Sequence, residues 1–511
     1  MSYFLGIDLG TSAVKCILVA NDGAVKAGHS VEYPLLTPKP GWAEQNPEDW
    51  WTGTAACIRQ LLDKAGVKGE DIAGVGLSGQ MHGSVFLDKE LQVVRPALLW
   101  CDQRTSEECD WIENTIGKAR LGELTGNRAL TGFTAPKVVW LRNQEPENYA
   151  RVSHLMLPKD YVRLQLTDAF GMDVADASGT LLLDVAGRRW SEEVVGELGI
   201  PMEWLPPIFE SNDVAGHITA SAAAATGLAE GTPVVAGGGD QACGAVGVGV
   251  VKPGIASVAL GTSGVVFVHD EEYQADPEQR LHSFCHGVPG KWHRMGVMLA
   301  AGGSFQWWKN HFSAEEKKQA DAEGRDVYEL LTELAEQAPL GSEGLLFAPY
   351  LTGERVPYPD PKARGGFIGL NIRHTKAHLT RAVMEGITFG LRDSLELVKE
   401  SGAEITELRV NGGGARSPFW RQMIADIFGA PVVTVNSTDG PAYGAAVMAA
   451  SGVLKRDTSE LCEEWISVVT RCEPNPANQA AYEKVYKVYR TLYPVLKDTF
   501  HQLSDLAEDQ A

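Results

Sequence analysis

The sequence predicts an α/β protein with two similar domains, and three observations support this prediction. Apolar, β-rich segments alternate with amphipathic stretches along the 511 residues, as in sheets covered by helices. The pattern I-D-L-G-T-S-A-V-K at residues 7–15 recurs as V-A-L-G-T-S-G-V-V at residues 258–266, and each copy predicts a hairpin. The chain is also too long for a single hydrophobic core. We therefore expect domains at residues 1–250 and 255–511, separated by the turn Lys252-Pro253-Gly254.

The individual elements follow in order from these patterns. Residues 4–7 and 14–19 flank the first Gly-Thr-Ser turn and residues 255–260 precede the second, so all three are predicted strands. Apolar runs predict further strands at 72–77, 234–236, 345–347 and 407–411, and helical spacing of apolar residues predicts helices at 47–65, 377–401 and 418–428. Tyr482, Tyr486, Tyr489 and Tyr493 predict one face of a packed helix, and the acidic residues 505–511 are expected to fray.

The composition narrows the class of protein. A net charge of −21 argues against nucleic acid or an anionic membrane as the main partner. The eight cysteines show no C-x-x-C spacing, which predicts reduced, mostly buried thiols and neither a zinc site nor a disulfide framework. The chain enters a strand without a basic leader, and Asp240 interrupts the glycine-rich stretch 233–251, so we expect neither a signal peptide nor a membrane span. The expected location is the cytoplasm.

The two Gly-Thr-Ser turns predict a binding site for a polyphosphate. Glycine lets an anion approach the backbone, and the turn presents N–H groups and hydroxyls. The candidate ATP contacts are Gly10, Thr11, Ser12 and Lys15 in the first copy, and Gly261, Thr262 and Ser263 in the second. Asp8, which is replaced by Ala259 in the second copy, would repel phosphate unless a cation bridged them, so it is the candidate Mg²⁺ ligand. The alternative is a strand-end carboxylate that caps its own turn.

Asp240 is the candidate general base. It follows the strand 234–236 and Gly237–Gly239, and it leads a run of small residues that predicts a helix. Its position predicts a helix N-cap, and a helix dipole would keep the carboxylate ionised. A purely structural cap is the alternative interpretation. The two roles are compatible, because a capping carboxylate can still accept a proton from a sugar hydroxyl.

Two further loops have the composition of ligand sites. The segment 411–417, N-G-G-G-A-R-S, lies between a predicted strand and a predicted helix, so Gly413, Gly414 and Ser417 are candidate adenosine contacts, with a structural turn as the alternative. Polar and aromatic side chains follow two apolar runs of the first half, and this combination suits a polyol. The candidate sugar contacts are Gln80, His82, Trp100, Asp102 and Arg104.

Taken together, these residues resemble the FGGY family of carbohydrate kinases. The signatures that carry the resemblance are G-F-T-A-P-K-V-V-W-L at 132–141 and G-G-F-I-G-L at 365–370, followed by H-L-T-R-A-V-M-E at 378–385. The resemblance implies two actin-like (ribonuclease H-like) domains flanking an interdomain cleft where ATP and a sugar meet, and homodimers are common in the family. It implies that Asp240 is the catalytic base, that Asp8 lies near Mg²⁺, and that Met81 and His82 contact the sugar. It also implies nucleotide contacts at Thr262, Gly302, Gln306, Gly413 and Ser417.

The expected substrates are ATP and a five-carbon ketose. Glycerol kinases of this family have Arg-Glu where this chain has Met81-His82, and they have a Tyr near Gly132 that this chain lacks, which implies a wider and less cationic pocket. A kinase for another pentulose or polyol is the first alternative. An actin-like or chaperone-like ATPase and a nonenzymatic sugar sensor are the others, and neither explains the polar loops together with both aspartates.

Overall fold

The computed structural model describes residues 2–437 and 439–508, which pack as two compact units. The first unit comprises Met1–Lys252, His269–His293 and Ser437–Ser467, and the second comprises Pro253–Val268, Arg294–Asn436 and Val468–Ala511. One boundary falls in the Lys-Pro-Gly turn at 252–254. The units are not continuous in sequence, however, because two later segments pack with the first unit, which a single division at 250–255 does not anticipate.

The first unit is built around a mixed seven-stranded sheet. Its strands are β1 (Tyr3–Leu9), β2 (Ala13–Ala20), β3 (Val25–Glu32), β5 (Ile72–Gly79), β13 (Val214–His217), β14 (Pro233–Val235) and β15 (Gly238–Gly239). The order is β13-β14-β5-β1-β2-β3, with β15 also paired to β5. The β1–β2 pair is the predicted antiparallel hairpin, and β5 runs parallel to β1. The Gly-Thr-Ser turn and the end of β5 therefore lie at the same edge of the sheet.

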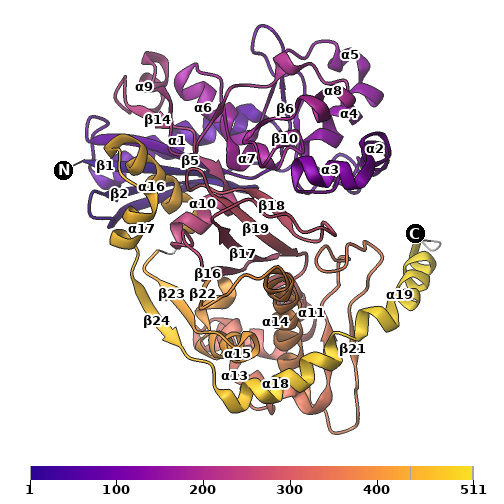
Figure 1. Ribbon diagram of the computed structural model, residues 1–511. Coiled ribbons are helices and arrows are strands. Elements are labelled where there is room, and N and C mark those ends of the chain that lie inside the picture. Colours follow the sequence, from indigo (N-terminus) through magenta and orange to yellow (C-terminus); the bar gives the residue numbers. More distant parts are fainter. Residues whose placement is uncertain (1, 438, 509–511) are drawn as a thin grey trace. The chain divides into compact units, whose positions relative to one another are not determined.

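Helices cover both faces of this sheet (Figure 1). Alternate residues of β1 divide between the two faces, so that Leu5 and Ile7 pack on one side and Phe4 on the other. Helices α1 (Pro47–Ala65), α6 (Pro158–Thr167) and α9 (Ala220–Thr226) contribute to the first core. Helices α10 (Asp240–Gly247) and α16 (Gly440–Leu454) contribute to the second. Helix α16 thus packs on the sheet of the N-terminal half, although it comes near the end of the chain.

Glycines in the central strands let α16 lie close to the sheet. A Cβ atom on Gly76 would overlap the carbonyl oxygen of Ala445 in α16. We expect Gly76→Ala to reduce the free energy of unfolding by about 1–3 kcal/mol, because backbone cannot move aside cheaply. Gly196→Ala in α8 (Glu192–Glu197) is the control, since its Cβ would have no atom within 4 Å. Thermal unfolding should show a lower midpoint for Gly76→Ala alone, and equal midpoints would contradict the packing argument.

A second seven-stranded sheet has the order β18-β19-β17-β16-β22-β23-β24. Its strands are β16 (Ile255–Leu260), β17 (Gly264–Asp270), β18 (His282–Cys285), β19 (Trp292–Met298), β22 (Glu407–Gly412), β23 (Val432–Val435) and β24 (Val468–Cys472). The β16–β17 pair is the second predicted hairpin, and β22 runs parallel to β16. The helices of the second unit are α11 (Gly302–Phe312), α12 (Ala314–Glu323), α13 (Val327–Glu336), α14 (Lys376–Glu400), α15 (Pro418–Phe428), α18 (Pro476–Tyr489) and α19 (Leu492–Glu508).

The remaining elements form smaller sheets and surface helices. In the first unit they are β4 (Glu44–Gln45), β6 (Val85–Leu87), β7 (Ala97–Leu98), α2 (Ser106–Ile112), α3 (Lys118–Thr125), α4 (Thr134–Gln144), α5 (Pro146–Tyr149), β8 (His154–Met156), β9 (Met172–Asp173), α7 (Val174–Ser178), β10 (Leu183–Asp184), β11 (Arg189–Trp190), β12 (Ile208–Phe209) and α17 (Thr458–Trp465). In the second unit they are β20 (Leu346–Ala348) and β21 (Gly366–Ile368). Among the described residues, no helix is both long enough and apolar enough to cross a membrane.

The structure confirms the predicted strands and helices. Strand 255–260 and helices 47–65 and 418–428 have the predicted bounds, and the others differ by a few residues. The packing of the tyrosine stripe is confirmed for α18, where Tyr482, Tyr486 and Tyr489 are buried and lie against Phe389 of α14.

Three details of these predictions need correction. Tyr493 is buried but belongs to the next helix, α19, because α18 ends at Tyr489. Asp240 is the first residue of α10, and the N-cap is Gly239. Helix α19 continues to residue 508, where fraying was expected from 505; residues 509–511 lie outside the described range.

Candidate functional site

The first Gly-Thr-Ser turn closes the β1–β2 hairpin and is joined to two predicted sugar contacts. The Gly10 N–H donates to the Ala13 carbonyl at 3.0 Å, which makes the turn tight. The Thr11 hydroxyl accepts a hydrogen bond from the Trp100 indole at 2.9 Å and donates to the Gln80 side-chain oxygen at 3.3 Å. The hydroxyl of Thr11 is therefore directed at the loop after β5. Contact between this turn and ATP stays a prediction.

Asp8 lies near the end of β1, flanked in the sheet by Lys15 of β2 and Ser78 of β5. The Ser78 hydroxyl donates to the Asp8 carboxylate at 2.9 Å. Desolvation raises the pKa of Asp8 to about 6, against the opposing effects of the Ser78 hydrogen bond and the Lys15 charge. Lys15 itself forms an ion pair with Asp439, the residue before α16. A phosphate that reached Lys15 would have to compete with this carboxylate.

Asp240 opens α10 at the point where β15 ends. Desolvation raises the pKa of Asp240 to about 7, and the charge of Asp8 adds to the increase. The carboxylate accepts a hydrogen bond from the Gln241 side chain at 3.3 Å. Two buried carboxyl groups with pKa values raised towards neutrality, one of them partly by the charge of the other, are typical of a site where protons are transferred. The structure thus brings together the two aspartates that the sequence singled out.

The predicted sugar dipeptide packs beside Asp240. Met81 contacts Gly239, since a Cβ on that glycine would lie 2.7 Å from the Met81 side chain. His82 has a positive φ of 68° and its Nδ1 is 2.7 Å from the Gly179 carbonyl oxygen, so Nδ1 is the donor. Its ring lies 4.6 Å from that of Phe133, centroid to centroid. Met81 and His82 are therefore fixed in orientation within the same unit as the candidate base.

Asp102 and Arg104 occupy a different kind of environment from the one predicted. The Asp102 carboxylate accepts the Ala43 N–H at 2.7 Å and pairs with Arg104, whose guanidinium also pairs with Glu44. Arg104 lies 3.5 Å over the ring of Trp42, and its side chain is 1% exposed. Side chains this enclosed support the loop and leave no surface for a sugar. Gln80 is also buried, whereas Trp100 is 36% exposed and can cover the C–H face of a ligand.

The sequence pattern did not predict one buried cluster of charged side chains. The Lys159 ammonium lies 2.7 Å from Asp160, 2.6 Å from Asp173 and 3.4 Å from Asp176, and all four side chains are buried. The Asp176 carboxylate lies close to Gly239 and therefore to the start of α10. In the sequence, Lys159 and Asp160 are typical of an ordinary polar helix start, and no pattern marks the two later aspartates as their neighbours.

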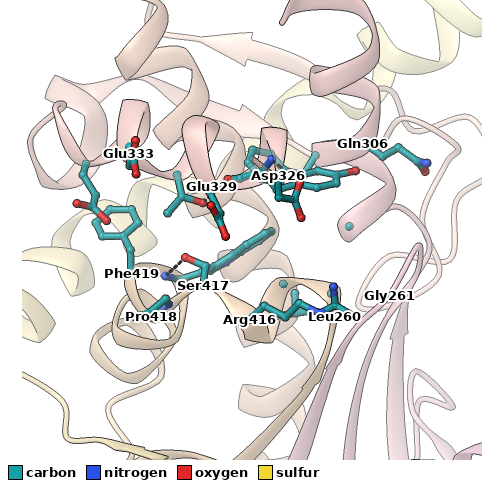
Figure 2. Close-up of a pocket in the computed structure, with 18 of the residues that line it drawn as sticks. Leu260, Gly261, Gln306, Asp326, Glu329, Glu333, Arg416, Ser417, Pro418 and Phe419 are labelled. Carbon is teal, nitrogen blue, oxygen red and sulfur yellow. Dashed lines mark hydrogen bonds between the residues drawn. The ribbon is translucent and has the colours of Figure 1, made fainter. Parts of the chain in front are cut away.

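The second Gly-Thr-Ser turn lines a pocket of about 740 Å³ within the second unit (Figure 2). The predicted nucleotide contacts that line it are Gly261, Thr262, Gly302, Gln306, Gly413, Gly414 and Ser417; Ser263 does not. Gly302 and Gly303 donate backbone hydrogen bonds to the Gly261 and Thr262 carbonyls, which fixes α11 against the turn. The Ser417 hydroxyl accepts the Trp420 N–H at 3.2 Å and caps α15. Three loops that are distant in sequence therefore form one cavity.

An acidic wall of this pocket was also missed. Asp326, Glu329 and Glu333 line it from α13 and the residue before it, together with Tyr328. Figure 2 shows Asp326 and Glu329 directed towards the loop that carries Arg416 and Ser417. The sequence of α13 is that of a simple amphipathic helix, so its polar residues gave no indication of a pocket.

Comparison with known proteins agrees with this geometry. The model of the FGGY family of carbohydrate kinases, N-terminal domain, matches residues 3–247, and that of the C-terminal domain matches residues 256–453. A xylulose kinase from Bacillus subtilis is 42% identical over 499 residues, with 98% of each chain covered. The structure of ligand-bound xylulose kinase from Lactobacillus acidophilus is similar with a TM-score of 0.91 and 26% identity, covering 98% of this chain and 100% of that one.

The fold does not by itself select the sugar. The structure of a gluconate kinase from Lactobacillus acidophilus also has a TM-score of 0.91, with 27% identity, and covers 98% of this chain and 99% of that one. Two kinases named for different sugars therefore share this architecture equally well. The family models cover both halves of the chain and include both Gly-Thr-Ser turns, Asp8 and Asp240. This chain belongs to the FGGY family of carbohydrate kinases.

Proposed function

We propose that this chain transfers the γ-phosphoryl group of ATP to D-xylulose, forming D-xylulose 5-phosphate. The observation that carries the proposal is Asp240, a carboxyl with a pKa raised to about 7 that lies next to the fixed Met81–His82 segment. The 42% identity with the Bacillus subtilis xylulose kinase over nearly the full length supports xylulose as the sugar. The alternative substrates are another pentulose or a polyol. Gluconate is also to be tested, because the structure of a gluconate kinase is similar to this one.

In the proposed reaction, the sugar lies against Trp100, Met81 and His82 with one hydroxyl at Asp240. The hydroxyl oxygen forms a bond to the γ-phosphorus while the bond from phosphorus to the bridging oxygen of ADP breaks. The hydroxyl proton passes to the Asp240 carboxylate and is then released to solvent, so that the base is ready for another cycle. In phosphoryl transfer the protein contributes positioning and charge stabilisation more than covalent chemistry. A base with a pKa near neutrality suits this role.

The nucleotide is proposed to occupy the 740 Å³ pocket of the second unit. The glycines at 261, 302, 413 and 414 leave backbone accessible to an anion or a ribose. Trp420 and Phe305, whose rings pack edge-on at 5.3 Å, supply apolar surface for a base. The pocket has the size expected of a small-molecule site, which is about 300–1,000 Å³.

Asp8 is the residue proposed to hold Mg²⁺. Its desolvated carboxylate lies close to the end of β1 and to Gly10, and it accepts a hydrogen bond from Ser78. This donor set fits Mg²⁺, which usually takes one or two carboxylates, water and substrate phosphate oxygens. Bound there, the ion would supply the positive charge that lets phosphate approach two carboxylates. Asp8 would orient that charge, and Ser78 would orient Asp8.

A coupled ADP-release assay across a panel of sugars tests the proposed function. The panel contains D-xylulose, other pentuloses, gluconate, glycerol and a sample without sugar. We expect ADP release that depends on D-xylulose, with a kcat/KM at least about tenfold above that for any other sugar, a difference of about 1.4 kcal/mol in transition-state binding. A higher kcat/KM for another sugar would replace D-xylulose as the substrate. ADP release that is indifferent to every sugar would indicate an ATPase of the same fold.

A further inference from the structure

The side chain of Gln45 lies at the centre of a hydrogen-bonded ring that joins the first Gly-Thr-Ser turn to the loop after β5. Gln45 belongs to the two-residue strand β4 and is 1% exposed. Its amide nitrogen donates to the Thr11 carbonyl at 2.7 Å and to the Pro34 carbonyl at 3.2 Å. Its amide oxygen accepts from the Gln80 amide at 3.0 Å and from the Trp50 indole at 3.0 Å. All of the hydrogen-bonding capacity of this amide is therefore used.

Thr11 and Gln80 close the ring. The Thr11 hydroxyl donates to the Gln80 oxygen at 3.3 Å, and the Gln80 nitrogen in turn donates to Gln45. The Trp100 indole adds a branch, because it donates to the Thr11 hydroxyl at 2.9 Å. Three side chains from β4, the first turn and the loop after β5 thus hold one another, and each donor faces an acceptor. Buried networks that are fully satisfied are rigid, and they are sensitive to the loss of any member.

The ring lies between the two groups of residues that the reaction requires. Thr11 is part of the turn proposed to face phosphate, and Gln80 is followed directly by Met81 and His82, which are proposed to face the sugar. Gln80 is only 2% exposed, so its amide serves the ring and not a ligand. Trp50, by contrast, is a residue of α1 whose side chain lies in the hydrophobic core, and its indole N–H donates to Gln45 from outside the ring.

We propose that Gln45 is a positioning residue for phosphoryl transfer, which keeps the Thr11 turn and the Gln80–Met81–His82 segment in one fixed register. The inference rests on the proposed function, because it assumes that these two segments face phosphate and sugar. Without the amide, the two segments keep the backbone hydrogen bond from the Gln80 N–H to the Leu9 carbonyl at 2.8 Å and the Thr11–Gln80 hydrogen bond. They lose the hydrogen bonds through which Gln45 holds the Thr11 carbonyl and the Gln80 side chain. A misplacement of about 1 Å in a reacting group can reduce the rate by about a hundredfold, so a loose register is costly to kcat.

Two variants test the proposal on the full-length enzyme. Gln45→Leu removes the amide at similar volume, and we expect kcat to fall at least about tenfold while the KM for ATP stays within about twofold. Trp50→Phe is the matched control, because it removes one donor to the same Gln45 oxygen but leaves the ring intact. Its thermal midpoint should fall, since a buried side chain loses volume and a hydrogen bond, but its kcat should stay within about threefold of the wild type.

A third variant, Gln45→Glu, adds a readout that a purely structural role would not change. The introduced carboxylate, when ionised, would face the Thr11 and Pro34 carbonyls without a proton to donate, whereas its protonated form would restore one donor. The kcat of Gln45→Glu relative to wild type should therefore be higher at about pH 6 than at about pH 8.5.

Either of two results overturns the proposal. One is that Gln45→Leu keeps kcat within about twofold of the wild type, and the other is that Trp50→Phe loses as much activity as Gln45→Leu. The wild-type sugar panel judges the proposed function separately, and the variant ratios are measured on whichever substrate the wild type turns over. Failure of the positioning role is thereby distinguished from failure of the proposed function.

Discussion

Replacing Asp240 with asparagine is expected to lower kcat at least about a hundredfold, which is the usual contribution of a general base. Asparagine keeps the shape of the side chain and cannot take the proton of the attacking hydroxyl. The KM for ATP and the affinity for ADP should change little, because Asp240 is not among the residues that line the nucleotide pocket. Steady-state kinetics and calorimetric titration with ADP measure the two effects separately.

The pH dependence of kcat/KM, compared between the wild type and Asp240→Asn, gives a second test of the base. With a pKa raised to about 7, Asp240 is largely protonated below neutrality. Because a base must be ionised to act, kcat/KM of the wild type should rise with pH up to about 7 and then level off. This rise should be absent in the residual activity of Asp240→Asn. A wild-type profile that is flat between about pH 5.5 and about pH 8 would contradict the assignment of the base.

Stability provides the control for loss of folding. Desolvation disfavours the ionised form of Asp240, so its pKa is higher in the folded chain than in the unfolded chain. Above about pH 7 the carboxyl is ionised in both states and the folded state bears the cost, whereas below the unfolded pKa it is protonated in both and there is none. The thermal midpoint of Asp240→Asn at about pH 8 should therefore equal or exceed that of the wild type. Asp22→Asn is the control: it removes one negative charge, as Asp240→Asn does, but at an exposed residue of the same unit. It should change neither the thermal midpoint nor kcat.

Most of the architecture could be predicted because its signals are local. Helix 47–65 begins with Pro47 and is followed by Gly66, which caps it in the left-handed region; a proline at the start and a glycine after the end are both visible in the sequence. The two Gly-Thr-Ser hairpins were predicted from glycine and β-branched residues within a short span. The family resemblance is confirmed by the family models. Local pattern fails, however, for segments 269–293 and 437–467, whose packing with the first unit depends on contacts far away in sequence.

The sequence predicted which residues belong to the candidate site better than it predicted how their side chains are oriented. Its aspartates and glycine loops stand out because polar and glycine-rich loops at strand ends are typical of ligand sites in α/β proteins. The orientation of a side chain is not encoded in this way. Asp102 and Trp100 follow the same apolar run, yet Asp102 is fully buried in an ion pair and Trp100 is 36% exposed. Gln45 gave no signal at all, since its partners Thr11 and Gln80 are 34 and 35 residues away.

The second large effect is expected for Asp8→Asn, which should raise the Mg²⁺ concentration required for half-maximal activity about tenfold or more, because metal ions prefer a charged oxygen ligand over a neutral amide. Asparagine can still accept the hydrogen bond of the Ser78 hydroxyl, so the strand end should keep its structure. Activity measured against total Mg²⁺ at fixed ATP provides the value. Titration of Mn²⁺ into the enzyme, followed by electron paramagnetic resonance, provides a measurement that does not depend on turnover.

Asp439→Asn is the control that distinguishes the loss of a metal ligand from the loss of a nearby negative charge. Asp439 is a carboxylate of the same neighbourhood that pairs with Lys15, and its charge raises the pKa of Asp8. Without the charge of Asp439, Asp8 should become ionised at a lower pH. The Asp8 carboxylate, which is the proposed Mg²⁺ ligand, is still present in this variant. The Mg²⁺ requirement of Asp439→Asn should therefore not increase. If both variants raised the requirement equally, the effect would come from the general negative potential of this region, and Asp8 would lose its place as the metal ligand.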